Sequence, residues 1–493
     1  MDMKPLFEPK TMAVIGISAT NDRHPANVIY AKNHLRYPVE VYAVNPKGGK
    51  LHNETIYPNV ADIPRKIDLA VIATRAELVP DVMADCIKAG VKSATVISGG
   101  FTEGGRKDLQ DRMVGMAKEA RFPFIGPNCL GVYVPFRVDT FFLPIERMIK
   151  PDAGGVTFVS QSGGILVDHM IKFAQQGVGL AKAISIGNKA FIKEKELLAY
   201  LTKDPTTKVI AYYIEGFGEG EGRDFVLAAD CSPKPVIIMK SGKTAAGSRA
   251  VSSHTASLAG DYASFAAAIA QHNIIEAANE SELVSFCEVL SSYTKPIDGN
   301  IGIITGSGGH GAMAVDACSL AGLKVPELSE QTKTEVKNNL TDSIRSIAAL
   351  GNPADLTGSS VDEDFVACAK VMGASNEIDC VIILLLPYIP GITLDIGVKL
   401  SSVSKQFNKP FIAYVPHVEK YTMLIEGFEL NGIPVSPSIE GAVLMAKALA
   451  RRQPCCKKRS KTLSINQKRG DGCWSRTRRK YFLSTASKHR NMP

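Results

Sequence analysis

Short runs rich in valine and isoleucine alternate with helix-length stretches along almost the whole chain. Each run has the length of a strand and is apolar at both odd and even positions. Strands of this kind are buried on both faces, so helices must cover each side of the sheet that they form. The alternation therefore predicts an α/β protein whose parallel strands are joined by crossover helices.

The alternation falls into three groups, which predict three consecutive doubly wound domains of Rossmann-like or flavodoxin-like type. Turn-forming residues near 150 and 297 separate them into domains of residues 1–150, 151–297 and 298–452. Strands are expected at 12–17, 39–45, 69–73, 94–98 and 123–126, then at 155–160, 183–187, 208–215 and 235–240, and finally at 300–305, 380–386, 410–415 and 433–437.

The net charge of +8 is unevenly distributed. Residues 453–493 contain 12 Lys and Arg and one acid, so this segment alone carries +11 and leaves −3 for residues 1–452. The folded part therefore lacks the basic surface expected of a nucleic-acid-binding protein. The 453–493 segment has no apolar periodicity and is expected to be a disordered basic tail. It is either a genuine extension or an out-of-frame end that replaces a further domain.

Composition excludes several other classes. The ten cysteines are irregularly spaced, with no CxxC and no His/Cys pair at metal spacing, so neither a disulfide scaffold nor a protein-held metal is expected. No apolar run approaches the ~20 residues that span a bilayer, so no membrane is expected among the partners. Residues 1–10 include two acids and no apolar core, which argues against a secretory signal and favours the cytoplasm.

Four glycine-rich turns follow strands of the first domain. They are Gly16–Asn21, Asn45–Gly49 with Lys47, Ser98–Glu103 and Gly126–Gly131. Ligands of doubly wound sheets bind beyond the carboxyl ends of the strands, where exposed N–H groups suit a phosphate. One such turn would be weak evidence and an exposed loop lysine is often merely solvated, but four turns at one edge indicate a nucleotide-like ligand.

Three features of the second domain could carry chemistry. The turn Ser162-Gly163-Gly164 precedes a helix, where it either binds an anion or is an ordinary serine cap. Glu215 closes an apolar strand, and its carboxylate is either solvated or orients a partner. The segment 242–260 is rich in Gly, Ala, Ser and Thr, without helical or strand periodicity. It predicts a flexible loop that presents His254, whose neutral imidazole can accept a phosphoryl group.

Five motifs, in this order, resemble the α-subunit of the NDP-forming acyl-CoA synthetases of the ADP-forming acetate–CoA ligase type, relatives of succinyl-CoA synthetase. The motifs are GPNCLG (126–131), VSQSGG (159–164), YIEGF (213–217), SSHTASLAG (252–260) and GNPADLTG (351–358). The resemblance covers residues 1 to about 452. It implies that CoA binds the first domain and that phosphate converts the acyl-CoA into an acyl phosphate. A phosphohistidine then forms at His254, and ADP receives the phosphoryl group.

The resemblance also implies site roles. Glu215 orients the active histidine, and Ser162, Gly163 and Gly164 begin the helix that cradles the phosphohistidine. The matching CoA contacts are Gly16, Ser18, Ala19, Thr20, Asn21, Lys47, Phe101, Thr102, Glu103 and Asn128.

Two departures from the family pattern bear on substrate and partner. Val167 stands where the dicarboxylate enzymes have a tyrosine, which favours a small monocarboxylic acid such as acetate. His310 stands in a turn where a proline is expected. Nothing in the sequence resembles an ATP-grasp domain, so ADP or ATP with Mg²⁺ is expected on a partner β-subunit, in an α2β2 assembly, or on a lost fused domain.

Two alternatives remain at this stage. A dehydrogenase would need a dinucleotide fingerprint in the first domain, which is absent. A non-catalytic CoA-binding regulator, or an acyltransferase scaffold, would require neither His254 nor Glu215.

Overall fold

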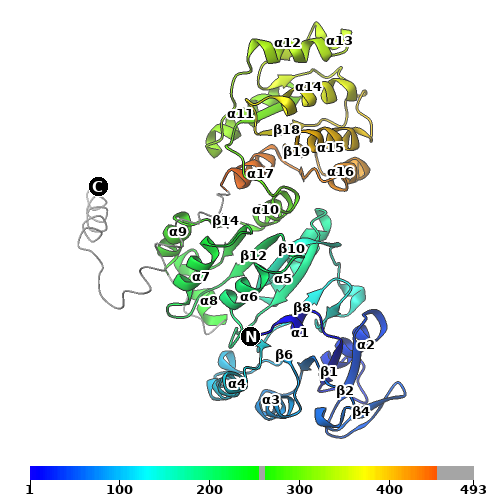
Figure 1. Ribbon diagram of the computed structural model, residues 1–493, viewed down its shortest axis with the longest axis vertical. Coiled ribbons are helices and arrows are strands. Elements are labelled where there is room, and N and C mark those ends of the chain that lie inside the picture. Colours follow the sequence, from blue (N-terminus) through cyan, green and yellow to red (C-terminus); the bar gives the residue numbers. More distant parts are fainter. Residues whose placement is uncertain (255–260, 452–493) are drawn as a thin grey trace, which may run out of the picture. The chain divides into compact units, whose positions relative to one another are not determined.

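A computed structural model describes residues 1–254 and 261–451, with side chains described through 251 and again from 261. The chain divides into a compact unit, Met1–Gln453, and the segment Pro454–Pro493. Within the compact unit three sheets follow one another, and helices cover both faces of each (Figure 1). The α/β fold predicted from the alternation is confirmed. The expected disordered tail lies outside the described residues.

The first sheet has seven strands, six of them in parallel ladders. In spatial order they are β3 (Gly49–Leu51), β4 (Glu54–Tyr57), β2 (Glu40–Val44), β1 (Thr11–Ile15), β5 (Leu69–Ile72), β6 (Ser93–Val96) and β7 (Phe124–Ile125). The associated helices are α1 (Lys4–Phe7), α2 (Pro25–Arg36), α3 (Val79–Lys88) and α4 (Lys107–Ala120). The order reverses beside β1, so the ends of β1 and β5 lie at the switch point where such sheets bind ligands.

The second sheet also has seven strands. Their order is β14 (Ile275–Ala277), β13 (Val236–Lys240), β12 (Val209–Ile214), β10 (Ala153–Ser160), β11 (Leu180–Ser185), β8 (Gly131–Val134) and β9 (Val138–Asp139). Its helices are α5 (Gly163–Gln175), α6 (Glu194–Leu201), α7 (Glu221–Asp230), α8 (Ala245–His254), α9 (Tyr262–Ala270) and α10 (Glu280–Ser292). Strands β8 and β9 precede the boundary expected at 150 yet pair antiparallel at the edge of this sheet. The domain boundaries themselves stay predictions.

The third sheet has six strands. Their order is β16 (Ala349–Leu350), β17 (Ala354–Asp355), β15 (Ile301–Thr305), β18 (Cys380–Leu384), β19 (Phe411–Tyr414) and β20 (Val435–Ser436). Its helices are α11 (Gly308–Ala321), α12 (Glu330–Asn339), α13 (Asp342–Arg345), α14 (Asp362–Ala374), α15 (Ile396–Phe407), α16 (Thr422–Glu429) and α17 (Ile439–Arg451).

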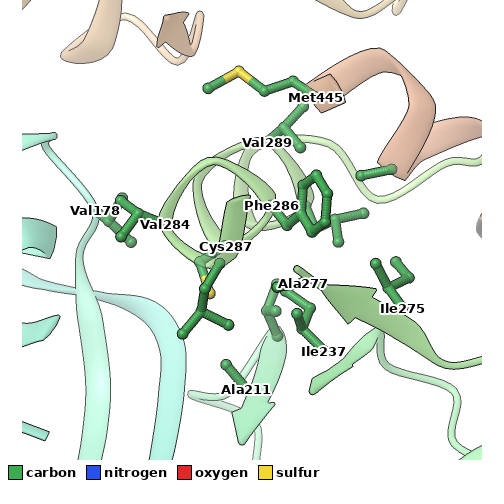
Figure 2. Packing of buried hydrophobic residues seen from close by; sticks show 14 of the residues in the cluster. Val178, Ala211, Ile237, Ile275, Ala277, Val284, Phe286, Cys287, Val289 and Met445 are labelled. Carbon is green, nitrogen blue, oxygen red and sulfur yellow. The ribbon is translucent and has the colours of Figure 1, made fainter. Parts of the chain in front are cut away.

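Successive residues of strand β10 point to opposite faces of the second sheet and pack in two separate apolar cores. Phe158 of β10 lies in a cluster that includes α10, and its neighbour Val159 lies in the cluster on the opposite face. Figure 2 shows Phe286 and Cys287 of α10 above the second sheet, with Met445 of α17 close by. One apolar core is therefore shared by the second and third sheets.

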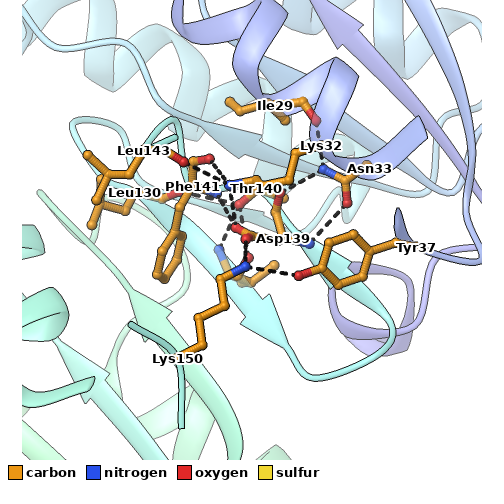
Figure 3. A network of polar contacts seen from close by, with 11 residues as sticks. Ile29, Lys32, Asn33, Tyr37, Leu130, Asp139, Thr140, Phe141, Leu143 and Lys150 are labelled. Atoms are coloured by element: carbon orange, nitrogen blue, oxygen red, sulfur yellow. Dashed lines mark hydrogen bonds and ion pairs between the residues drawn. The ribbon is translucent and has the colours of Figure 1, made fainter. Parts of the chain in front are cut away.

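A buried polar network ties the first sheet's helices to the second sheet (Figure 3). The Asp139 carboxylate, fully buried on β9, contacts the Lys32 ammonium at 2.9 Å and the Lys150 ammonium at 2.5 Å. The Asn33 side chain exchanges two hydrogen bonds with the Asp139 backbone, at 2.7 and 3.0 Å. Burial lowers the pKa of Lys32, and the attraction of Asp139 opposes that change. Helix α2 is thereby joined to an edge strand of the neighbouring sheet.

Candidate active site

The turn after β1 has the shape that the sequence predicted for a phosphate-binding loop. Gly16 adopts φ +105°, and a Cβ atom there would lie 2.3 Å from the Ala73 carbonyl oxygen, so only glycine fits. Ser18 is held by the Asn27 side chain, which accepts a hydrogen bond from Ser18 N at 2.8 Å and donates one to Ser18 O at 2.7 Å. Residues 19–21 are exposed and lead into α2.

The turn that carries Lys47 lies beside this loop. Asn45 donates a hydrogen bond from its side chain to Ile17 O at 2.7 Å and accepts one from Lys47 N at 2.9 Å. The Lys47 residue is exposed. The ends of β1 and β2 are thus fixed together while the lysine stays open to a ligand.

The third turn of the predicted CoA site is held in shape by two of its own residues, Phe101 and Glu103. The Phe101 side chain is fully buried in the first-domain core, so only its backbone faces the strand ends. The Glu103 carboxylate accepts hydrogen bonds from Gly100 N at 2.6 Å and from Phe101 N at 3.2 Å. Desolvation raises the pKa of Glu103, but these bonds and one from Asn188 lower it overall. Glu103 therefore acts within the loop, and Thr102 remains half-exposed beside it.

Asn188, which sequence reasoning overlooked, joins the strand ends of the two sheets. Its side chain donates a hydrogen bond to the Glu103 carboxylate at 2.5 Å and accepts one from the Asn128 side chain at 3.3 Å. Glu103 and Asn128 follow strands of the first sheet, whereas Asn188 follows β11 of the second. The expected CoA edge of the first sheet thus lies directly against the strand ends of the second sheet.

The start of α5 meets Asn128 around a hollow of about 550 Å³. Ser162 caps the helix by accepting a hydrogen bond from Ile165 N at 3.4 Å, and Gly164 leaves the space before the first turn open. The hollow is lined by Ile97, Asn128, Cys129, Leu130, Phe142, Leu143, Gly163, Gly164, Val167, Asp168 and Ile171. Helix N-terminal N–H groups and an apolar wall suit a ligand with an anionic head and an apolar tail.

Glu215 lies at the end of β12, on the wall of a separate cleft of about 440 Å³. The residue is 6% exposed, and its Oε2 atom has no hydrogen-bond partner among the described residues. Burial raises the pKa of the adjacent Tyr213 phenol, and Glu215 raises it further. Of the two interpretations open from sequence, the buried position contradicts the solvated one.

The Glu215 backbone is fixed by a buried side-chain network. Gln161 accepts hydrogen bonds from the N–H groups of Glu215 and Gly216, and donates to Gly216 O at 2.9 Å. The Lys189 ammonium also donates to Gly216 O, at 2.6 Å. Gln161 and Lys189 both donate to the Glu194 carboxylate, at 2.7 and 2.6 Å.

A second buried ammonium stands at the neighbouring strand end. Lys240 closes β13, which pairs with β12 so that Lys240 lies opposite Ile214. Its Nζ atom donates to Glu215 O at 2.6 Å and to Ser241 O. Desolvation lowers the pKa of Lys240, and Glu215 partly offsets that effect.

The segment that carries His254 begins just beyond Lys240, and here one sequence expectation is wrong. Residues 245–254, expected within a flexible loop, form helix α8. Alanine is the strongest helix former, and the Thr244 hydroxyl accepts a hydrogen bond from Gly247 N at 3.0 Å, as a cap does. A helix therefore forms without a regular apolar stripe. The His254 side chain and residues 255–260 lie outside the described residues.

One cluster of possible metal ligands occurs in the described part of the chain, at Asp168, His169 and Glu280. The Lys172 ammonium lies 2.5 Å from both the Asp168 and the Glu280 carboxylates and forms an ion pair with each. His169 bonds Ile165 O at 2.8 Å, and burial lowers its pKa. Both carboxylates of the cluster are thus ion-paired with Lys172, and His169 is buried beneath them. No helix among residues 1–254 and 261–451 is long and apolar enough to cross a bilayer.

Comparison with known proteins agrees with this arrangement. Residues 10–135 match the CoA binding domain, and residues 153–290 match the succinyl-CoA ligase like flavodoxin domain. The chain is 36% identical over 387 residues to acetate–CoA ligase (ADP-forming) I of Archaeoglobus fulgidus, which covers 78% of this chain and 55% of that one. It is 31% identical over 465 residues to the α subunit of acetate–CoA ligase (ADP-forming) I of Pyrococcus furiosus, covering 91% and 97%.

The fold itself has a close relative of known structure. It matches the dinucleotide forming acetyl-coenzyme A synthetase 1 of Ca. Korarchaeum cryptofilum, in complex with phosphate and ADP, with a TM-score of 0.83 and 28% identity. The match covers 95% of this chain and all of that one. The present chain nevertheless spans only about half the length of the A. fulgidus ligase.

Fold and strand-end sites together define a CoA-binding α/β protein of the succinyl-CoA ligase type. More particularly, the chain belongs to the ADP-forming acetate–CoA ligase family of NDP-forming acyl-CoA synthetases. This membership confirms the resemblance drawn from the five sequence motifs.

Proposed function

We propose that the chain is the CoA-binding, histidine-carrying part of an NDP-forming acyl-CoA synthetase. Phosphate displaces CoA from an acyl-CoA to give an acyl phosphate, and His254 takes the phosphoryl group as the carboxylate leaves. ADP then accepts the phosphoryl group from His254 and becomes ATP. Each step exchanges one phosphoryl or acyl bond for another, and the covalent carrier divides a difficult transfer into two easier ones.

The observation that carries this proposal is that the strand ends of the first sheet lie beside the strand ends of the second sheet. The turn with Asn128 closes the first sheet and borders the same hollow as Gly163 and Gly164 at the start of α5. An acyl thioester held by the first domain would thus place its reacting carbon near helix N–H groups that stabilise phosphate charge. Glu215, buried at the next strand end, supports the proposed histidine by accepting its ring N–H.

The remaining CoA contacts are proposed from the same strand ends. The backbone of Gly16, Ser18, Ala19, Thr20 and Asn21 and the Lys47 ammonium suit the phosphates of CoA. Thr102 and the backbone of Phe101 border the next turn. Glu103 is proposed at the same site, where it also holds that turn and Asn188.

The proposed acid is a small monocarboxylate such as acetate. Val167 stands on the apolar wall of the hollow, with Leu130, Phe142 and Ile171. This wall offers no cation to a second carboxylate, whose burial without a partner costs several kcal/mol. A specificity constant for succinate equal to that for acetate would contradict the assignment.

The nucleotide site is proposed to lie on a partner. ADP or ATP with Mg²⁺ would bind an ATP-grasp β-subunit, assembled with this chain as α2β2, and a cytoplasmic location stays a prediction. The relative in P. furiosus is itself named an α subunit. The test is to mix the purified chain with a separately produced ATP-grasp subunit, acetyl-CoA, ADP and phosphate. ATP should form only in the mixture, and ATP made by the chain alone would contradict the division of sites.

A further inference from the structure

The network around Gln161 is the most completely buried polar cluster that borders the Glu215 cleft. Gln161 and Lys189 are each 8% exposed, and Glu194 is 1% exposed. The Lys189 ammonium has two described hydrogen-bond acceptors, Glu194 Oε1 and Gly216 O, and also lies 5.1 Å from the centre of the Phe217 ring. Burying an ammonium and a carboxylate costs several kcal/mol per ion, so such a pair is weak evidence for stability.

The geometry of the network points to Glu215 instead. Both N–H groups of the Glu215-Gly216 turn are held by one amide oxygen, that of Gln161. The Gly216 carbonyl oxygen is held from two sides, by Gln161 and by Lys189. The Glu215 carbonyl oxygen is held by Lys240. Every backbone polar group of Glu215 and Gly216 is therefore fixed, while the Glu215 Oε2 atom is left without a partner.

We propose that Gln161, Glu194 and Lys189 are positioning residues that aim the Glu215 carboxylate at the imidazole of the phosphoryl carrier. This inference rests on the proposed function and goes beyond it, because it assigns the residues that act through Glu215. A strand end is otherwise free to move, and a displacement of about 1 Å in a reacting constellation can lower a rate about 10²-fold. The network removes that freedom from the Glu215 carboxylate, which the proposed function pairs with His254.

The test substitutes Lys189 by methionine, which keeps the stem of the side chain and removes its charge. Lys182 provides the matched control, because it is 2% exposed, lies within β11, the strand that precedes Lys189, and pairs with Asp204 at 2.5 Å. Both substitutions leave a buried carboxylate without its partner, but only Lys189→Met disturbs Glu215. A Lys189→Met/Glu194→Gln double variant removes both charges and preserves the fold if the single variant unfolds.

The measurement is the single-turnover rate constant for labelling of His254 by saturating acetyl-CoA and radiolabelled phosphate, on full chain with its ATP-grasp partner. Lys189→Met should lower this rate constant about 10²-fold, with the half-saturating acetyl-CoA concentration unchanged, and Lys182→Met should not. Combined with Glu215→Gln, Lys189→Met should cause no further loss, because the two residues act as one unit. Lys189→Arg, which keeps the charge, should retain part of the rate that Lys189→Met loses.

Two outcomes would overturn the inference and are distinct from failure of the proposed function. Equal rate constants for wild type and Lys189→Met would show that the network is structural only. Additive losses in the Glu215→Gln background would show that Lys189 does not act through Glu215. A wild-type chain that takes no label at His254 would instead refute the proposed function itself, and the positioning role with it.

Discussion

Lys47 illustrates how a single exposed side chain can carry binding energy at a strand end. It stands on the turn fixed by Asn45, beside the loop that Ser18 begins. We expect Lys47→Ala to weaken CoA binding by about 1.5–3 kcal/mol, because a charge-assisted contact to phosphate is lost. Isothermal titration with CoA measures the change. Lys66→Ala is the control, since that exposed lysine precedes β5 at the opposite edge of the sheet. Equal CoA affinities for wild type, Lys47→Ala and Lys66→Ala would contradict the assignment.

The residues of the site differ in how far the sequence could reveal them. Gly16 was predictable because a glycine directly after a strand marks a turn that needs positive φ. Glu215 was visible as an acid that ends an apolar strand. Lys189 and Glu194 gave no comparable signal, because a lysine and a glutamate five positions apart resemble any solvated pair. Their burial depends on the turn after β12, which is distant in sequence, so only the folded chain reveals the network.

At the scale of elements, the apolar strands were easier to predict from sequence than strands β8 and β9 or helix α8. Each strand expected from an apolar run overlaps a strand of the structure, since burial on both faces leaves a strong pattern. Strands β8 and β9 were missed, because β8 begins at Gly131, where the sequence predicted a glycine-rich turn, and β9 has only two residues. Helix α8 was missed for a different reason, as its stability comes from alanine content and a threonine cap rather than periodicity.

The pair α2 and β9 provides a stability test. We expect Asp139→Ala to lower the free energy of unfolding by about 3–5 kcal/mol, because it leaves the buried Lys32 and Lys150 ammonium groups without their carboxylate. Urea unfolding followed by circular dichroism measures this loss. Asp108→Ala, at an exposed ion pair with Arg106, should leave the transition in place. An unchanged midpoint for Asp139→Ala would show that the network does not stabilise the junction.

Helices α10 and α16 bring two acids together and predict a pH dependence. Burial raises the pKa of Glu429 to about 7, and it raises the pKa of Glu288, which Glu429 increases further. A carboxyl whose pKa is raised by folding binds a proton that the unfolded chain has already released. The free energy of unfolding should therefore fall as pH rises from about 4.5 to 7.

Glu429→Gln should remove on the order of 2 kcal/mol of this dependence, because the amide mimics the protonated acid. Denaturation curves at pH 5 and pH 8 give the difference. Glu419→Gln, at an exposed acid, is the control. A Glu429→Gln protein whose stability varies with pH as wild type does would contradict the assignment.

At the scale of the whole molecule, the three sheets share apolar cores, but the proposed function gives the first and second sheets different roles. In the proposed function the turns of the first sheet bind CoA, and the second sheet supplies the start of α5, Glu215 and the helix that leads to His254. From composition alone we expect deletion of residues 453–493 to leave CoA affinity unchanged and to lower non-specific binding to polyanions such as heparin, since +11 is removed. Titration with CoA tests the first expectation, and salt-dependent heparin binding tests the second. A loss of CoA affinity on deletion would assign the segment a role in the CoA site.

The central claim is that His254 carries a phosphoryl group between an acyl phosphate and ADP. Incubation with acetyl-CoA and radiolabelled phosphate, in the presence of the ATP-grasp partner, measures it most directly. The account predicts an acid-labile, base-stable label on this chain that ADP removes as ATP and that His254→Ala abolishes. A label that persists in His254→Ala would show that another residue is the carrier, and would contradict the account.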